Sequence, residues 1–197
     1  MPNLGQNLEL SRCPQCSIAN PLLNSIHQFK TVDHEGLNRR SWRIYTCSTC
    51  GGVVTAWGSA YDHPISGYFP ASLEANSQIP DRPRAFLQQA QESLHAPAGA
   101  VMLCGSSVDA MLKAKGYIEG SLYARIEKAA ADHLITDEMA KWAHEVRLDA
   151  NDQRHADQSS ALPTPQDATR VIEFVNALAE FLFVLPSRVS RGLQASG

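Results

Sequence analysis

The sequence predicts a mainly α-helical protein, in which a bundle of four or five helices follows a small β domain. Two observations support this fold class. Four of the five cysteines lie within the first 50 residues, among segments in which apolar and polar residues partly alternate. After residue 80, apolar residues recur instead at the three- and four-residue spacing of amphipathic helices. We therefore expect two domains, over residues 1–72 and 73–197.

The composition excludes several classes of protein. The 197 residues include 17 basic and 20 acidic side chains, which gives a formal net charge of −3. This balance argues against a surface that is basic throughout, although it allows a local basic patch. No apolar run reaches the roughly 18 residues of a membrane span, and residues 1–10 lack the pattern of a signal peptide. We therefore expect a cytoplasmic protein with reduced thiols and no membrane partner.

Three segments of the first domain have the character of β-strands. They are rich in β-branched and aromatic residues and cover residues 25–32, 41–46 and 53–57. The stretch from Tyr61 to Pro80 contains three prolines and one glycine. Such a composition predicts a connector without a long strand or helix.

The four early cysteines form two CxxC pairs, Cys13 with Cys16 and Cys47 with Cys50, separated by 30 residues. Each pair can turn two thiolates toward one ion, and four thiolates complete a tetrahedral zinc shell that leaves no open position. Gly51 allows a positive φ next to the second pair. The spacing therefore predicts a structural zinc ribbon. The alternatives are an iron–sulfur cluster, which uses the same ligands, and two disulfides.

Basic and aromatic side chains interleave between the two cysteine pairs. The candidate nucleic-acid-binding residues are Lys30, Arg39, Arg40, Trp42 and Arg43. Cations of this kind can contact phosphates, and aromatic rings can stack on bases. The alternative is a solvated hairpin whose aromatic side chains cover the metal site.

The second domain is expected to contain five helices, over residues 81–95, 98–115, 121–133, 137–156 and 165–185. Ser121, Asp137 and Thr164 are suited to cap the last three of these helices, and Pro165 suits a first helical turn. Pro186 is expected to end the last helix. This helix is apolar nearly all round, which indicates the core of a bundle or a dimer interface.

Four polar residues share one face of the helix expected at 137–156: His144, Arg147, Asn151 and His155. A guanidinium, an amide and an imidazole aligned in this way suit phosphate binding. With a ribose 2′-hydroxyl, they also suit cleavage of RNA by general acid–base chemistry. Arg147, Asn151 and His155 are therefore candidate catalytic residues. The alternative is a structural role, in which Arg147 pairs with an acid such as Asp109.

Two stretches, AVMLCGSSVDAMLKAKG and VRLDANDQRHAD, resemble the bacterial domain of unknown function 4145 family. The resemblance covers roughly residues 80–190. It implies a bundle like that of the HEPN superfamily (higher eukaryotes and prokaryotes nucleotide-binding), which commonly dimerises, with a zinc ribbon in front. The ribonuclease motif of that superfamily consists of an arginine, a polar residue, three further residues and a histidine. Asn151 and His155 match the polar residue and the histidine, whereas Ala150 stands at the position of the catalytic arginine. Arg147, one turn earlier, is the possible substitute.

Three functions are consistent with these features. The first is a zinc-containing, nucleic-acid-associated binding or regulatory protein, dimeric through its helical domain, in phage defence or restriction-type systems. The second is a metal-independent HEPN-type endoribonuclease. The third is a structural protein-interaction module without nucleic-acid contact. The sequence favours binding over catalysis, because Ala150 replaces the arginine that the ribonuclease motif requires.

Overall fold

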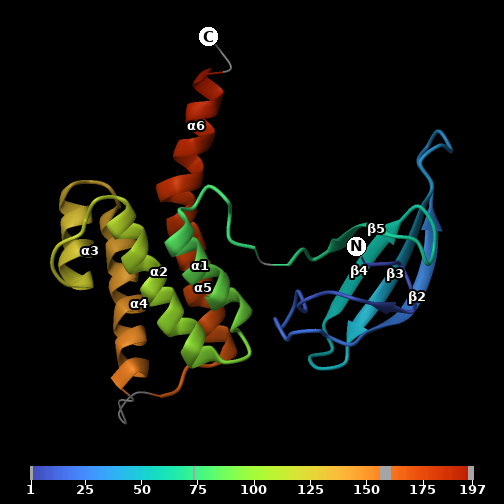
Figure 1. The fold of residues 1–197 in the computed structure, drawn as a ribbon, viewed down its shortest axis with the longest axis horizontal. Coiled ribbons are helices and arrows are strands. Elements are labelled where there is room, and N and C mark those ends of the chain that lie inside the picture. The colour runs from blue at the N-terminus through green and yellow to red at the C-terminus, as the bar shows by residue number, and fades with distance from the viewer. Residues whose placement is uncertain (1, 73, 156–160, 195–197) are drawn as a thin grey trace. The chain divides into compact units, whose positions relative to one another are not determined.

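The computed structural model describes residues 2–72, 74–155 and 161–194. The chain divides into two compact units, Met1–Leu73 and Glu74–Gly197 (Figure 1). The first unit is built from β-strands and the second from helices, and each has a hydrophobic core of its own.

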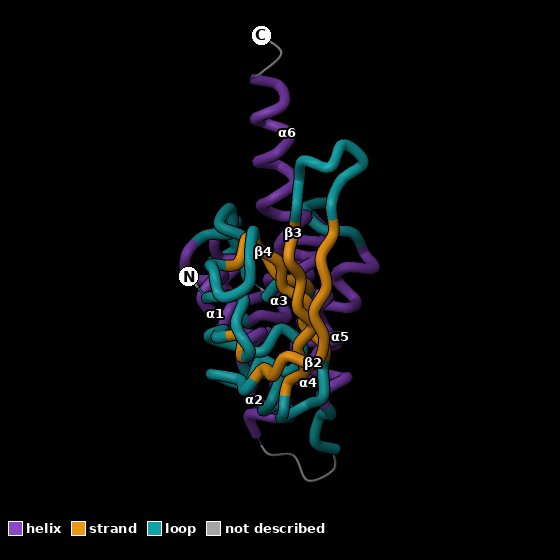
Figure 2. The backbone as a smooth tube through the Cα atoms, turned by 90° about the vertical axis from the view of Figure 1, so that its right-hand side faces the viewer, coloured by secondary structure: helices purple, strands orange, loops and turns teal. Residues whose placement is uncertain are grey.

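The β unit is one antiparallel sheet in which each strand pairs with the next along the chain (Figure 2). Its strands are β1 (Asn7–Leu8), β2 (Leu23–Thr31), β3 (Arg40–Cys47), β4 (Val53–Gly58) and β5 (Ile65–Phe69). The pairing of β2 with β3 shifts between Ser25 and His27, where β2 has a bulge. Short connections join β2 to β3, β3 to β4 and β4 to β5, whereas the longer segment between β1 and β2 carries Cys13 and Cys16.

One face of the sheet is buried and the other is partly open to solvent. On β3 the buried side chains alternate with half-buried ones, because successive residues of a strand point to opposite faces. Tyr45 is fully buried, and its hydroxyl donates a hydrogen bond of 2.8 Å to the carbonyl oxygen of Gly5. Leu8, Leu23 and Val54 pack in the same core.

The second unit consists of α1 (Asp81–Glu92), α2 (Pro97–Ala114), α3 (Leu122–Ala131), α4 (Asp137–His155), α5 (Pro165–Ala179), the π-helical segment η1 (Glu180–Val184) and α6 (Leu185–Gln194). Its core takes side chains from several helices, among them Leu87, Met111, Ile126, Val146 and Phe174. None of the helices in the described part of the chain is long and apolar enough to cross a membrane.

The predicted caps of α3 and α5 are confirmed, whereas at the start of α4 the hydroxyl of Thr136, not the predicted Asp137, accepts a hydrogen bond from the N–H of Met139. The Ser121 hydroxyl accepts a hydrogen bond from the backbone N–H of Ala124 at the start of α3. At the start of α5, Thr164 and Asp167 form a reciprocal capping box. These local hydrogen bonds fix where both helices begin.

The predicted fold class is wrong. The structure is a mixed α/β fold with 48% helix and 18% strand, not a mainly helical HEPN-like bundle behind a small ribbon. Two strands, β1 and β5, were not predicted, and β5 lies inside the stretch expected to be an irregular connector. Gly67, at the middle of β5, carries no side chain that would exclude the Trp57 indole from that position. The sequence patterns therefore predicted three of the five strands of this sheet.

The last helix extends further than predicted. We expected it to end before Pro186, but α5, η1 and α6 follow one another as far as Gln194. In η1 the backbone N–H of Leu185 donates to the carbonyl of Glu180, five residues earlier. This π-helical turn accommodates Pro186, which lacks an N–H. The predicted end of the fourth helix, Ala156, lies outside the described residues.

Candidate functional site

The two CxxC pairs adopt the same backbone turn. The backbone N–H of Ser17 donates to the Cys13 carbonyl at 2.9 Å, and the N–H of Gly51 donates to the Cys47 carbonyl at 2.8 Å. Ser17 and Gly51 both have a positive φ, of 59° and 70°. Glycine reaches this conformation without strain, whereas serine does so at a cost. The chain therefore builds two matching knuckles.

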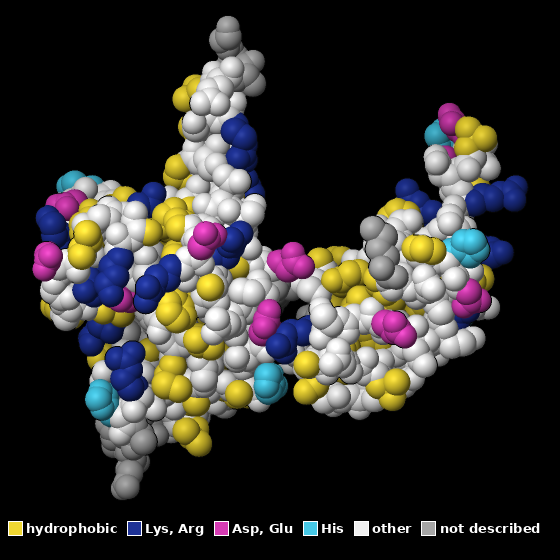
Figure 3. Space-filling view, in the orientation of Figure 1, with side chains coloured by type: hydrophobic (Ala, Val, Ile, Leu, Met, Phe, Trp, Pro, Cys, Tyr) yellow, Lys and Arg dark blue, Asp and Glu magenta, His cyan; other side chains and the backbone are white. Residues whose placement is uncertain are grey.

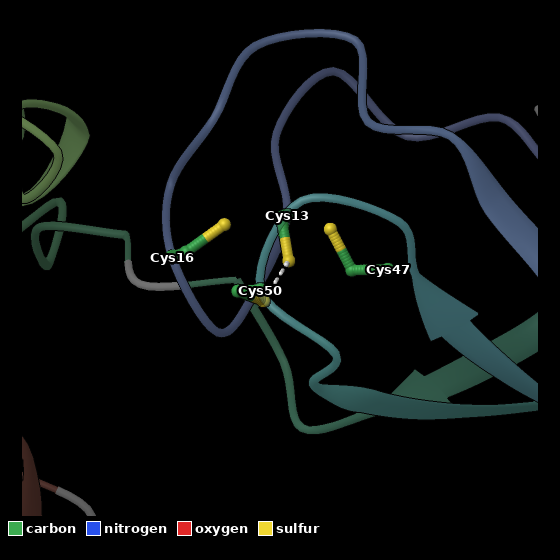
Figure 4. A group of neighbouring side chains, drawn as sticks. All are labelled: Cys13, Cys16, Cys47 and Cys50. Carbon is green, nitrogen blue, oxygen red and sulfur yellow. Dashed lines mark hydrogen bonds between the residues drawn. The ribbon is translucent and has the colours of Figure 1, made fainter.

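The four cysteine sulfurs converge on one point (Figure 4). They all lie within 4.8 Å of one another, and the Sγ atoms of Cys13 and Cys50 are 4.0 Å apart. A tetrahedral zinc ion with Zn–S bonds of about 2.3 Å separates its sulfurs by about 3.8 Å. The backbone N–H groups of Gln15 and Gly52 donate to the sulfurs of Cys13 and Cys50 at 3.4 and 3.3 Å. The cluster therefore fits a metal ion held by four thiolates.

Close packing holds the two knuckles together. The side-chain amide of Gln15 donates to the Val53 carbonyl at 3.0 Å. A Cβ atom on Gly52 would lie only 2.5 Å from the Gln15 side chain, so glycine is required at this contact. Gln15 lies between the two cysteines of the first pair, and Val53 follows the second pair. This contact therefore fixes the distance between the two pairs.

The thiols of the cluster differ in pKa. Burial raises the pKa of Cys16 to about 12 and also raises that of Cys13. At Cys47 burial acts in the same direction, but the backbone hydrogen bonds of Cys50 and Thr49 help to lower the pKa to about 7. A bound cation favours the thiolate form of every ligand. Binding of a metal ion would therefore release protons from those cysteines that are still thiols.

The structure divides the predicted nucleic-acid-binding residues between the two faces of the sheet. Trp42 is half-buried on the open face, and exposed Arg39 precedes β3. Arg43 is only 5% exposed on the opposite face, where its guanidinium lies 4.9 Å from the Tyr61 ring centroid. The ammonium of Lys30 lies 5.6 Å from the same centroid. Arg43 is therefore not available to a ligand on the open face.

The open face carries a row of aromatic rings that continues across three strands. The row consists of His27, Phe29, Trp42 and Trp57. Neighbouring ring centroids lie 5.9–6.0 Å apart, and the rings of Phe29 and Trp42 are nearly parallel. The Arg40 guanidinium lies 4.8 Å from the Trp57 centroid. Phe29 and Trp57 were missed from the sequence, although strand pairing places both beside Trp42.

The helical unit contains a cleft of about 730 Å³ bounded by α1, α2, α3 and α4. Two of the three predicted catalytic residues, Arg147 and Asn151, line this cleft. His155 is exposed at the end of α4 and is not among the lining residues. His144 is instead engaged by Glu127, with 2.8 Å between Nε2 and Oε1. The structure therefore brings together the guanidinium and the amide without an imidazole.

Asp109 does not pair with Arg147. Its carboxylate binds Arg125 at 2.5 Å and Lys113 at 2.6 Å. The Arg147 guanidinium lies 5.5 Å from the Tyr123 ring centroid, and its Nε atom is buried without a hydrogen-bond partner. Among the described residues, no carboxylate therefore neutralises Arg147, which lines the cleft.

Close packing around Ala150 leaves no room for the arginine that the ribonuclease motif has at this position. Ala150 is 5% exposed, and a Cβ atom on Gly105 would lie only 2.7 Å from its own Cβ. An arginine at position 150 would have to displace helix α2.

Cys104, next to Gly105, is completely buried. Burial raises the pKa of its thiol to about 12. The prediction that Cys104 is a buried hydrophobic residue is therefore confirmed.

Comparison with known proteins identifies the helical unit. The family model described as "Domain of unknown function (DUF4145)" matches residues 88–195. The chain belongs to this family. No curated protein and no solved structure matches the chain. The predicted family is therefore confirmed, and the matched region contains most of the cleft but not Arg82 or Phe86.

Proposed function

We propose that this member of the DUF4145 family is a zinc-binding, nucleic-acid-associated protein whose β unit binds single-stranded nucleic acid. The observation that supports this proposal is the aromatic row across β2, β3 and β4. A row of rings on an open sheet face suits unpaired bases, because every base has a flat face that can stack on a ring. Each base stacked on an aromatic side chain contributes about 1–3 kcal/mol.

Two exposed cations at the start of β3 support the proposal. Arg39 and Arg40 are exposed at the start of β3, and the guanidinium of Arg40 covers the Trp57 ring. A stacked guanidinium leaves its N–H groups free to contact phosphates at the ring's edge. Lys30 lies toward the other face, beside Tyr61. The ligand is therefore expected to contact Arg39 and Arg40 rather than Arg43.

The metal has a structural role in this proposal. Four thiolates fill the coordination shell of zinc, so the ion has no open position for a substrate. Cys13 and Cys47 are buried in the same core as Tyr45, from which the strands that carry the aromatic row extend. Reduced thiols are required as ligands, which supports a reducing compartment such as the cytoplasm.

Replacing one ring tests the nucleic-acid proposal. Fluorescence anisotropy would measure binding of a labelled single-stranded RNA or DNA to the full chain at about 50 mM salt. Trp42→Ala should weaken binding by about tenfold, whereas Trp42→Phe, which keeps a ring, should retain most of the affinity. Zinc content and circular dichroism would show that both variants are folded. No binding by the wild type, or equal binding by Trp42→Ala, would overturn the proposal.

A metal-independent endoribonuclease is the second candidate, supported by the presence of Arg147 and Asn151 in one cleft. If the protein cleaves RNA without added metal, and if His155→Ala abolishes that cleavage, catalysis would be favoured over a binding role.

A protein-interaction module is the third candidate, and absence of any mobility shift at low salt would favour it. A role in phage defence or restriction-type systems is supported by the sequence resemblance alone.

The proposal includes a homodimer formed through the helical unit. Four apolar side chains repeat every four residues along one side of η1 and α6, and all of them are exposed: Phe181, Leu185, Val189 and Leu193. Figure 3 shows hydrophobic side chains on one side of α6 and basic ones on the other. Helix α6 has no buried residue, so this apolar stripe is open to solvent in a single copy of the chain. A second copy of the same stripe would cover it.

A further inference from the structure

The cleft of the helical unit is strongly cationic. Its lining includes five basic side chains: Arg82, Lys113, Arg125, Arg147 and Arg154. Among the described residues that line it, Asp109 is the only acid, so the lining has a formal charge of +4. The whole chain, in contrast, has a net charge of −3. The positive charge is therefore concentrated here, and Figure 3 shows basic side chains gathered over α2, α3 and α4.

Most of this charge is not neutralised within the unit. Asp109 binds Lys113 and Arg125, and the Arg125 guanidinium also donates to the Ile118 carbonyl at 3.0 Å. In the described part of the chain, no carboxylate pairs with the other three cations, Arg82, Arg147 and Arg154. The buried Nε of Arg147 has no acceptor at all among those residues. The Arg147 side chain lines the cleft without a carboxylate partner among the residues that the structure describes, and an anion in the cleft would neutralise its charge.

The start of α3 adds to the positive potential. Ser121 caps this helix, and Ser121, Leu122 and Tyr123 line the cleft. The first N–H groups of a helix and its macrodipole favour an anion at this end. The Tyr123 ring, 52% exposed and next to the Arg147 guanidinium, offers a flat surface beside the cationic groups.

The floor of the cleft is a close contact between α2 and α4. Gly105 faces Ala150 so closely that a Cβ atom at 105 would lie 2.7 Å from the Ala150 Cβ. Arg147 and Asn151 flank Ala150 on α4, and all of these residues line the cleft. Two small residues thus set how far the guanidinium of Arg147 lies from the groups on α2.

We propose that this cleft is a binding site for a nucleotide-sized ligand that carries a diphosphate group. The volume of about 730 Å³ falls within the range of about 300–1,000 Å³ that small-molecule sites occupy. A diphosphate has roughly three negative charges at neutral pH, which is close to the +4 of the lining. Arginine is the side chain best suited to phosphate oxygens, since its planar fork donates two parallel hydrogen bonds. The cleft belongs to the helical unit, and ligand binding there does not depend on the aromatic row of the β unit.

Isothermal titration calorimetry of the full chain tests the proposal with ADP, pyrophosphate, adenosine and sulfate at about 50 mM salt. ADP and pyrophosphate should bind, and adenosine and sulfate should bind at least about tenfold more weakly. Arg147→Gln and Arg154→Gln should each weaken pyrophosphate binding by about tenfold. Arg191→Gln removes the same charge from α6, outside the cleft, and should leave binding unchanged.

Three results would overturn the proposal. They are absence of heat with both ADP and pyrophosphate, equal binding of sulfate, and equal losses in the cleft variants and in Arg191→Gln. Circular dichroism of Arg154→Gln, an exposed position, separates a loss of binding from a loss of folding. Competition between ADP and a single strand, with and without a 5′-phosphate, separates a free nucleotide from a strand end as the source of the phosphates. The Trp42→Ala variant should still bind pyrophosphate, so failure of the single-strand proposal is distinguishable.

Discussion

Replacing Gly105 by alanine tests the packing that positions the cleft. The added Cβ would lie 2.7 Å from the Cβ of Ala150, whereas ordinary contacts between carbon atoms are about 3.5–4.0 Å. Helices α2 and α4 would have to separate by about 1 Å to accept it. Gly99, in the same helix, has no atom within 4 Å of its would-be Cβ and is the matched control.

The two substitutions should have opposite effects on stability. Overpacking costs about 1–3 kcal/mol, and exchanging glycine for alanine inside a helix returns up to about 1 kcal/mol. Gly105→Ala should therefore destabilise the helical unit by up to about 2 kcal/mol, whereas Gly99→Ala should stabilise it by up to about 1 kcal/mol. At about 2–4 °C for each kcal/mol in a chain of this size, the melting temperatures should differ by several degrees.

Thermal unfolding followed by far-ultraviolet circular dichroism measures this difference, because the signal comes mainly from the helices. The exchange Gly105→Ala with Ala150→Gly moves one methyl group across the contact and should restore most of the lost stability. Gly105→Ala alone should also weaken pyrophosphate binding, because it moves Arg147 away from α2. A Gly105→Ala protein as stable as Gly99→Ala would refute the close contact.

Two further predictions concern the rest of the chain. Light scattering at micromolar concentration should show that the wild type is a dimer and that Val189→Glu is a monomer, because burying a charge at the centre of the α6 stripe is costly. A monomeric wild type would contradict the proposed interface. A strong chelator should unfold the β unit and leave most of the helical signal, since all four clustered cysteines lie in the β unit; loss of the helical signal in parallel would contradict the independence of the two units.

Local signals predicted the helices well. The apolar spacing of each segment and the capping residues Ser121 and Thr164 act within a few residues, so the sequence displays them directly. The cysteine pairs are equally local, because each CxxC forms its own turn. The prediction failed at Pro186, where the π-helical turn allows the helix to continue.

The β unit was predicted less well because its weaker strands depend on distant partners. The two residues of β1 pair with Leu23 and Asn24, and no local pattern marks so short a strand. The placement of Arg43 could have been recognised. A period of two puts Arg43 on the same face of β3 as Tyr45 and Cys47, which face the core.

The cationic cleft was predicted only in part. Arg147 and Asn151 are one turn apart on α4, so their common face is visible in the sequence. Arg82, Lys113 and Arg125 come from three other helices, and only the packing of the unit brings them to the same cleft. The contact between Gly105 and Ala150 is likewise a property of the packed helices.

The metal content of the protein tests the central claim most directly. Elemental analysis of untagged protein, purified under reducing conditions, should find about one zinc ion per chain. Cys47→Ala should lose the metal, whereas Cys104→Ala, a control in the core of the helical unit, should retain it. Wild-type protein without a bound metal, or zinc that persists in Cys47→Ala, would contradict a site built from Cys13, Cys16, Cys47 and Cys50.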